Sequence, residues 1–294
     1  RAPKALGVPE FAFQFNYGYH FDAAKLSELV RDHAVSTLGV HHLFANLTGV
    51  ERGASGAISA LALDNGTALA GDFFIDCSGQ RGLLIGEAMG VPMTSMSHVL
   101  PNDRAVATQV PYSDPSAQIA SVTRSTAQAS GWIWDIGLQS RRGVGYVHSA
   151  AHISEDEAVS TVLDYVRQSD DGIDLGQLNV RVIPFEASRR TQAWVKNCVA
   201  VGLSAGFIEP LEASSIALIE QASNRLCQML PLDADNCEAE ARAFNEQMNR
   251  QWSQVEEFLQ LHYVLSQRND SAYWRDVRSE ERVLPELSEK LKKW

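Results

Sequence analysis

The most restrictive stretch of this 294-residue chain is residues 197–216, which read NCVAVGLSAGFIEPLEASSI. Its first five residues are apolar except for Asn197 and predict a buried strand, and small residues follow that strand directly. Pro210 then favours a helix start, because proline fits the first helical turn. A strand, a turn of small residues and a helix N-terminus let an extended ligand reach bare backbone, and the free N–H groups at the helix end favour an anion. We therefore expect a binding turn within a fold of the α/β class.

Two carboxylates, Glu209 and Glu212, lie in the middle of this run. If the helix begins at Pro210, their three-residue spacing places both on its first turn and near each other. Acidic residues at this end of a helix also have a plain structural explanation, because they stabilise the helix dipole by roughly 0.3–1 kcal/mol. The spacing alone leaves the functional and the structural interpretation open.

Composition limits the classes of partner. The formal net charge of -11 argues against nucleic acid or an anionic membrane surface. The 45% hydrophobic content is sufficient for a buried core, and no apolar stretch has the length of a membrane span. The cysteines lack the spacing of a metal site, so we expect reduced thiols and no metal. In the absence of a signal peptide, the expected location is cytoplasmic. The four cysteines are Cys77, Cys198, Cys227 and Cys237.

Periodicity and capping residues predict the remaining elements. Asp22 suits the N-cap of a helix over residues 23–37. Ser154 and Glu157 form a capping box that opens a helix to about residue 168. Further strands are expected at residues 41–51, 57–63, 68–76, 104–111, 131–138, 144–149, 181–185 and 191–194, and a further helix over residues 238–266.

Five segments, in order along the chain, resemble the flavin-dependent halogenases of the tryptophan halogenase family. The most specific of them is the GFIEPLEASSI part of the run described above. Five segments in family order are far more specific than any one alone, and together they extend from about Tyr19 to Trp274. The other four are residues 20–23, residues 72–84, residues 131–136, and a C-terminal segment with His262, Tyr263, Arg268, Asp270, Tyr273 and Trp274.

The resemblance implies an α/β fold that is α+β in this portion. Residues 1–92 are expected to form part of an FAD-binding domain of the flavin monooxygenase type, and residues 191–235 its strand-turn-helix. Residues 93–190 are expected to form a substrate-side sheet, and residues 236–294 a helical region at the substrate pocket. None of the 20 glycines forms a GxGxxG turn. Relatives carry that motif and a catalytic lysine in a preceding N-terminal stretch, so we expect a C-terminal fragment.

The resemblance also implies roles for individual residues. Glu212 is expected to be the catalytic carboxylate that helps to activate the halogen or removes the proton from the attacked ring, whereas Glu209 is expected to be structural. Ser214 and Ser215 are expected to bind halide through backbone N–H groups. They replace the Thr-Gly of well-known relatives, and the loss of glycine restricts φ. Residues expected to line FAD are Gly202, Ser204, Ala205, Gly206, Pro210 and Ile216.

Aromatic residues are expected on the substrate side. Trp132 and Trp134 project to one side of a strand because they are two residues apart. This tryptophan pair is linked in the family to suppression of ordinary monooxygenation, although paired aromatics also occur in plain cores. Gly137 replaces the usual proline after the pair, so we expect a looser strand end. The residues expected to bind substrate are Trp132, Trp134, Tyr263, Asn269, Tyr273 and Trp274.

Asn269 bears on the choice of substrate. Tryptophan-specific members commonly carry a glutamate there, which binds the substrate's ammonium group. An asparagine cannot form that charge-assisted bond, which is about twice as strong as a neutral one. The expected substrate is therefore a simple indole or another electron-rich aromatic rather than free tryptophan.

The implied function is FADH2-dependent halogenation of such an aromatic through hypohalous acid, with halide as co-substrate and a flavin reductase as partner. One alternative, favoured by Ser214, Ser215 and Gly137, is a related FAD-dependent monooxygenase or reductase. A second is a non-catalytic remnant that packs as a homodimer. A third is a hydrolase, because residues 202–206 fit GxSxG and His262 could complete a triad.

Overall fold

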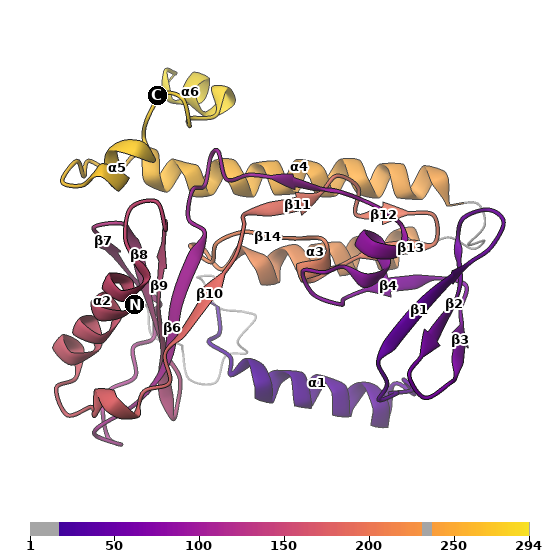
Figure 1. Ribbon diagram of the computed structural model, residues 1–294, viewed down its shortest axis with the longest axis horizontal. Helices are drawn as coiled ribbons and strands as arrows, with labels where there is room; N and C mark the ends of the chain where they lie inside the picture. The colour runs from indigo at the N-terminus through magenta and orange to yellow at the C-terminus, as the bar shows by residue number, and fades with distance from the viewer. Residues whose placement is uncertain (1–17, 231–236, 294) are drawn as a thin grey trace, which may run out of the picture.

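The computed structural model describes residues 18–230 and 237–293 as four small sheets beneath one long helix (Figure 1). The long helix, α4 (Glu238–Val264), runs along the upper side of the view, and α1 (Ala23–Thr37) lies on the opposite side. Residues 1–17, which are the start of the region 1–92 expected to form part of an FAD-binding domain, lie outside the described residues. The mixture of sheets with a helical C-terminal region agrees with the predicted fold class.

The largest sheet is antiparallel and has the order β10-β6-β9-β8-β7. Helix α2 (Glu155–Ser169) covers one face, and it begins with the predicted capping box of Ser154 and Glu157. The apolar core between them includes Val106, Ile133 and Tyr146, which are fully buried. The strands are β6 (Arg104–Pro111), β7 (Arg124–Gln128), β8 (Gly131–Gly137), β9 (Arg141–His148) and β10 (Arg181–Pro184).

A parallel pair of strands joins segments that are far apart in sequence. Strand β13 (Cys198–Ala200) pairs with β4 (Phe74–Asp76), and β12 (Trp194–Val195) adds an antiparallel edge. All three residues of β13 are buried, as expected of a strand that is covered on both faces. The turn after β13 therefore starts from a fixed position in the core.

The single strand predicted over residues 68–76 is wrong in its extent. It divides into β3 (Ala68–Ala70) and β4, which belong to different sheets. Strand β3 pairs with β2 (Ile58–Leu63), and β2 pairs with β1 (Leu47–Arg52). The apolar pattern is continuous, but hydrogen-bond partners on two sheets divide it.

Two other strand predictions also need correction. The strand predicted from residue 41 begins at Leu47, so residues 41–46 have no regular structure. The strand predicted at residues 191–194 is replaced by β11 (Ser188–Arg190) and β12 on either side of a bend. Strand β11 forms the centre of a small sheet of order β14-β11-β5, with β5 (Met93–Ser95) and β14 (Gly206–Phe207).

Helix α3 (Ser214–Met229) begins four residues later than predicted. Ala213 has a left-handed backbone with φ 52°, so the helix does not extend back to Pro210. Glu209 and Glu212 therefore lie on a loop rather than on a first helical turn. The shorter helical elements are a π-helical turn at Leu83–Ala88, 3₁₀ turns at Leu175–Gln177 and Gly202–Ser204, α5 (Ala272–Asp276) and α6 (Pro285–Leu291).

Helices α3 and α4 pack against each other and against β12 and β13. The stripe predicted on α4 faces this core: Phe244, Met248, Trp252 and Leu259 are buried, and Val255 is partly buried. Among residues 18–230 and 237–293, no helix combines the length and the apolarity needed to cross a bilayer. Of the four cysteines, Cys198 and Cys237 are buried, whereas Cys77 and Cys227 are exposed.

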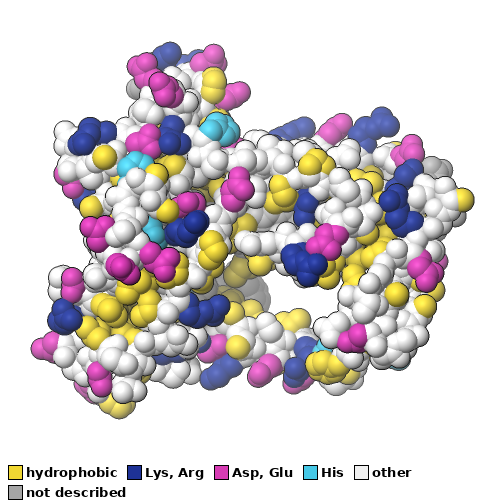
Figure 2. All heavy atoms as spheres, viewed as in Figure 1, with side chains coloured by type: hydrophobic (Ala, Val, Ile, Leu, Met, Phe, Trp, Pro, Cys, Tyr) yellow, Lys and Arg dark blue, Asp and Glu magenta, His cyan; other side chains and the backbone are white. Residues whose placement is uncertain are grey.

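Helix α1 has the predicted bounds, and Asp22 caps it by accepting a hydrogen bond from the Lys25 N–H. None of its residues is buried, and an opening separates it from the body of the molecule (Figure 2). Its exposed apolar side chains include Leu29, Val30 and Val35. Nothing in the described part of the chain covers this apolar surface.

Asp76, at the end of β4, holds the parallel pair to its surroundings. Its carboxylate is 1% exposed and accepts hydrogen bonds from the backbone N–H and hydroxyl of Ser78 through one oxygen. The other oxygen accepts from the N–H groups of Leu84 at 2.9 Å and Ile85 at 2.8 Å. Four donors would lose their acceptor if this side chain were removed.

We expect Asp76→Ala to lower the free energy of unfolding by about 3 kcal/mol, because buried donors left without a partner are costly. Asp76→Asn, which keeps one oxygen, is expected to lose about half as much. Urea unfolding measures both variants, with Asp72→Ala, an exposed side chain, as the control within about 0.5 kcal/mol of wild type. A loss for Asp76→Ala no larger than for the control would contradict the anchoring role.

Candidate active site

The residues of the turn after β13 are small, and their small size allows neighbouring strands to pack closely. A Cβ atom at Gly206 would lie 2.6 Å from the Ser188 carbonyl oxygen, so only glycine permits the approach of β14 to β11. Ser204 is fully buried, and its hydroxyl donates to the carbonyl oxygens of Asp76 and Val201. Ala205 is also buried.

This packing corrects part of the predicted FAD lining. The side chain of Ser204 is an internal anchor between two strands, and not a surface residue of the turn. Gly202 is partly buried with φ +75°, whereas Pro210 and Ile216 are exposed. Of the six predicted residues, Gly202, Pro210 and Ile216 form the accessible side of the turn.

The N-terminus of α3 meets the chemical needs of an anion site. Ser214 and Ser215 are its first residues, and no side chain caps the free N–H groups there. Ala213 and Lys196 are the only non-glycine residues with positive φ in the described part of the chain. Ser215 therefore has an ordinary backbone, and the predicted cost of replacing glycine there does not arise.

The side chain of Glu212 is accessible to solvent and lies close to the imidazole of His262. The Glu212 side chain is 48% exposed, and its Oε1 lies 3.1 Å from the Nε2 atom of His262 on the last turn of α4. The described residues do not shield this carboxylate from water. They do place the carboxylate two residues before the free N–H groups of α3, on the same surface loop.

Glu209 lies on the other side of the same loop and is 1% exposed. It accepts hydrogen bonds from the hydroxyl of Tyr263 and from the side-chain amide of Asn102 at 2.7 Å, and that amide also lies 2.9 Å from the Tyr263 hydroxyl oxygen. Burial raises the pKa of Glu209, and these two hydrogen bonds lower it in part. The two glutamates thus differ completely in their surroundings, although the sequence spacing predicted neighbours.

The tryptophan pair projects to one side of β8, as predicted, with ring centroids 6.2 Å apart. Trp132 is 4% exposed and belongs to the core that also contains Tyr263. Trp134 is partly buried and lies over Gly145, where a Cβ atom would be 2.1 Å from the indole ring. Gly137, where a looser strand end is predicted, has little room for a side chain, because a Cβ atom there would lie 2.9 Å from the side chain of Ile119.

The C-terminal aromatic residues are part of the same core. Tyr273 is fully buried and Trp274 is 5% exposed, and their rings meet edge to face at 5.2 Å. The Trp274 indole N–H donates to the Gln128 carbonyl oxygen at 2.7 Å, and the Arg268 guanidinium lies 5.2 Å from its ring. The described residues therefore leave no open slot between these rings, and Asn269 lies outside them on the surface.

Two contributors were missed from the sequence. Asn102 follows a proline in a loop and is 107 residues from Glu209, so no local pattern indicated it. His262 was noted within the family-like segment and as a possible triad member, but its pairing with Glu212, 50 residues away, was not predicted. Residues 18–230 and 237–293 contain no cluster of three His, Cys, Asp or Glu side chains that could hold a metal ion.

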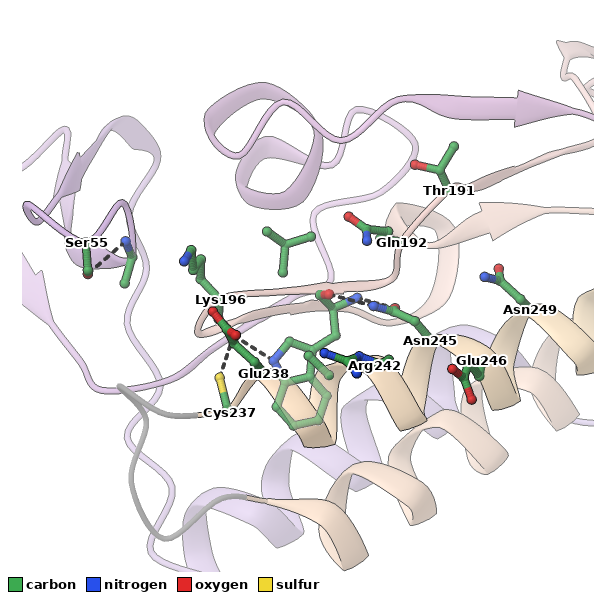
Figure 3. Close-up of a pocket in the computed structure, with 14 residues that line it drawn as sticks. Ser55, Thr191, Gln192, Lys196, Cys237, Glu238, Arg242, Asn245, Glu246 and Asn249 are labelled. Atoms are coloured by element: carbon green, nitrogen blue, oxygen red, sulfur yellow. Dashed lines mark hydrogen bonds between the residues drawn. The ribbon is translucent and has the colours of Figure 1, made fainter.

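Two cavities lie beside helix α4, and one of them adjoins the candidate site. A small one of about 50 Å³ separates the Gly202 turn from α3 and α4, and Ser215, Ile219 and Trp252 line it. A larger hollow of about 480 Å³ opens beside the start of α4 (Figure 3). Lys196 and Arg242 line it, but none of the predicted site residues does. The smaller cavity alone adjoins the candidate site.

A family model for tryptophan halogenase matches residues 2–294 of this chain. The chain belongs to the tryptophan halogenase family. Its structure is similar to that of a tryptophan halogenase from Shewanella frigidimarina, with a TM-score of 0.94 and 42% identity, covering 100% of this chain and 55% of that one. The predicted resemblance and fold class are confirmed.

Two further members of this halogenase family illustrate the match. BrvH, a flavin-dependent halogenase from Brevundimonas sp. BAL3, has a TM-score of 0.86 and 40% identity, over 94% of this chain and 54% of that one. The tryptophan 6-halogenase SttH from Streptomyces toxytricini is 38% identical over 283 residues, which are 96% of this chain and 52% of SttH. This chain spans about half the length of the relatives it matches.

The buried Glu209 predicts a specific pH dependence. Because its pKa is raised in the folded state, the stability it contributes is greatest at low pH and falls as pH rises from about 4.5 toward the folded-state pKa. Glu209→Gln removes this titration. We therefore expect the free energy of unfolding of Glu209→Gln, relative to wild type, to increase between about pH 5 and about pH 8 in urea unfolding. Parallel pH curves for the two proteins would contradict this, and Glu220→Gln, on the exposed side of α3, is the matched control.

Proposed function

We propose that this protein acts in FADH2-dependent halogenation of an electron-rich aromatic substrate, with halide as co-substrate and a flavin reductase as partner. The observation that carries the proposal is the arrangement of residues 202–216. A partly exposed glycine turn, an uncapped helix N-terminus and an accessible carboxylate occur within fifteen residues there. Membership of the halogenase family supports the same reaction class.

The residues on the accessible side of the 202–216 turn have the size and polarity that a bound flavin requires. The carboxyl ends of β4 and β13 meet at this turn, and such an end of a parallel sheet is a common ligand site. Gly202, Pro210 and Ile216 would hold the ring system, and the N–H groups of Ser214 and Ser215 would hold halide. Ile216 is 65% exposed, so a bound ring would cover apolar surface that now contacts water. When bound, reduced FAD supplies hypohalous acid from oxygen and halide.

Glu212 would act as the base of the reaction. As the aromatic ring attacks the halogen of hypohalous acid, a carbon–halogen bond would form from a ring electron pair, and the halogen–oxygen bond would break with its electron pair leaving on oxygen as hydroxide. The proton on that carbon then passes to the carboxylate, and the electrons of the broken C–H bond restore the ring. A carboxylate with one oxygen hydrogen-bonded by His262 has its other oxygen available for this proton.

The substrate proposed is a simple indole or a related electron-rich ring. Asn269 is exposed and neutral, so it offers no charge to the ammonium group of free tryptophan. A related monooxygenase is a weaker alternative, because Ser215 has an ordinary negative φ and fits its position without strain.

In the halogenating protein, we expect Glu212→Gln to lower kcat for halogenation by about 10²–10⁴, the range for loss of a general base. Flavin affinity is expected to stay within about twofold, because Gln keeps the size of the side chain. Product analysis with a flavin reductase, bromide and indole measures the first effect, and a flavin titration measures the second. Glu220→Gln is the control. An oxygenated product without halogen would support the monooxygenase instead.

We also expect Asn269→Glu to raise kcat/KM for tryptophan relative to indole by about tenfold. The new carboxylate can form a charge-assisted hydrogen bond with the amino-acid ammonium group, and such bonds are worth about 1.5–3 kcal/mol. Competition between the two substrates in one assay measures the ratio directly. An unchanged ratio would show that Asn269 lies outside the substrate site.

A further inference from the structure

We propose that His262 is a positioning residue that holds one oxygen of Glu212 and leaves the second oxygen of this carboxylate free. The inference rests on the proposed function and extends it to a residue outside the GFIEPLEASSI run. His262 lies on the last turn of α4, and Glu212 lies on the loop before α3. Two elements distant in sequence thus meet at one carboxylate–imidazole pair.

The contacts of the His262 imidazole show that its Nδ1 atom carries a proton. Its Nδ1 atom lies 2.9 Å from the carbonyl oxygen of Phe258, one helical turn earlier. A carbonyl oxygen can only accept, so Nδ1 must donate an N–H to it. The ring of Phe258 also meets the imidazole edge to face at 4.9 Å and limits its rotation. Only Nε2 remains for Glu212.

The pair between Nε2 and Oε1 must share one proton. Their separation is 3.1 Å, and two lone pairs would repel each other at that distance. With Nδ1 already protonated, a proton on Nε2 makes the ring an imidazolium opposite a carboxylate. The resulting bond is charge-assisted and roughly twice as strong as a neutral one. It fixes the orientation of the carboxylate, so that the second oxygen of Glu212 is free to accept a proton.

The surroundings of the pair allow a proton that Glu212 has taken up to leave again. Both side chains reach solvent, with 48% of Glu212 and 35% of His262 exposed, so water can take the proton. Glu209 is an acidic group near His262; burial raises the pKa of its carboxyl, and the charge of the imidazole lowers that pKa only in part.

The first experiment tests the pair without any halogenation. Long-range ¹H–¹⁵N correlation spectra of the full chain are expected to show His262 with its proton on Nδ1 when the ring is neutral. Glu212→Gln is expected to shift the His262 Nε2 resonance and to leave that of the exposed His98 unchanged. A neutral ring protonated only on Nε2, or an unchanged Nε2 resonance in Glu212→Gln, would overturn the proposed pairing.

The second experiment tests the positioning role in the halogenating holoenzyme with reduced FAD, bromide and indole. We expect His262→Leu to lower kcat roughly tenfold and His262→Gln roughly threefold, because Gln can still donate a neutral hydrogen bond to Glu212. The KM for indole and the flavin affinity are expected to stay within about twofold, and His98→Gln is the matched control.

A double-variant cycle separates this role from a purely structural one. In the Glu212→Gln background, His262→Leu is expected to cause no further loss of kcat. An equal loss in both backgrounds, or no loss in either, would overturn the proposal. If the wild-type protein forms no halogenated product, the proposed function fails, and the NMR result still decides whether His262 and Glu212 form the pair.

Discussion

The parallel pairing of β4 with β13 is the interaction on which the candidate site depends. It joins residues 74–76 to residues 198–200, and Asp76 extends it to the π-helical turn at Leu83–Ala88 through hydrogen bonds to backbone N–H groups. Ser204 adds hydrogen bonds from the following turn to the carbonyl oxygens of Asp76 and Val201. The accessible side of residues 202–216 is thereby held on a rigid base. A loop without this base could not present a carboxylate and free N–H groups in a constant geometry.

The two glutamates of this loop show how one short run can serve both the core and the surface. Glu209 points inward and connects the loop to Tyr263 on α4 and to Asn102 before β6. Glu212 points outward and contacts His262, the neighbour of Tyr263 on α4. The same turn of α4 therefore contacts both carboxylates. The inner contact fixes the loop to the core, which allows the outer contact to have a defined distance.

The aromatic residues expected at the substrate are instead closely packed among themselves. Trp132, Tyr263, Tyr273 and Trp274 are all buried in one cluster that is shared by β8, α4 and α5. Their apolar surface stabilises the contact between the large sheet and α4. In the described residues, the accessible chemistry lies at the edge of this cluster, at Glu212, His262 and the start of α3.

The sequence by itself determined much of the local structure, because caps and periodicity act over a few residues. The bounds of α1, the capping box of α2 and the buried stripe of α4 are examples. The family was also evident, because short motifs occur in a constant order. Only the tertiary structure divided residues 68–76 between two sheets and turned Glu209 inward and Glu212 outward. Those outcomes depend on Asn102, Tyr263 and His262, whose distance along the chain leaves no periodic trace, and on hydrogen bonds that form only when distant segments meet.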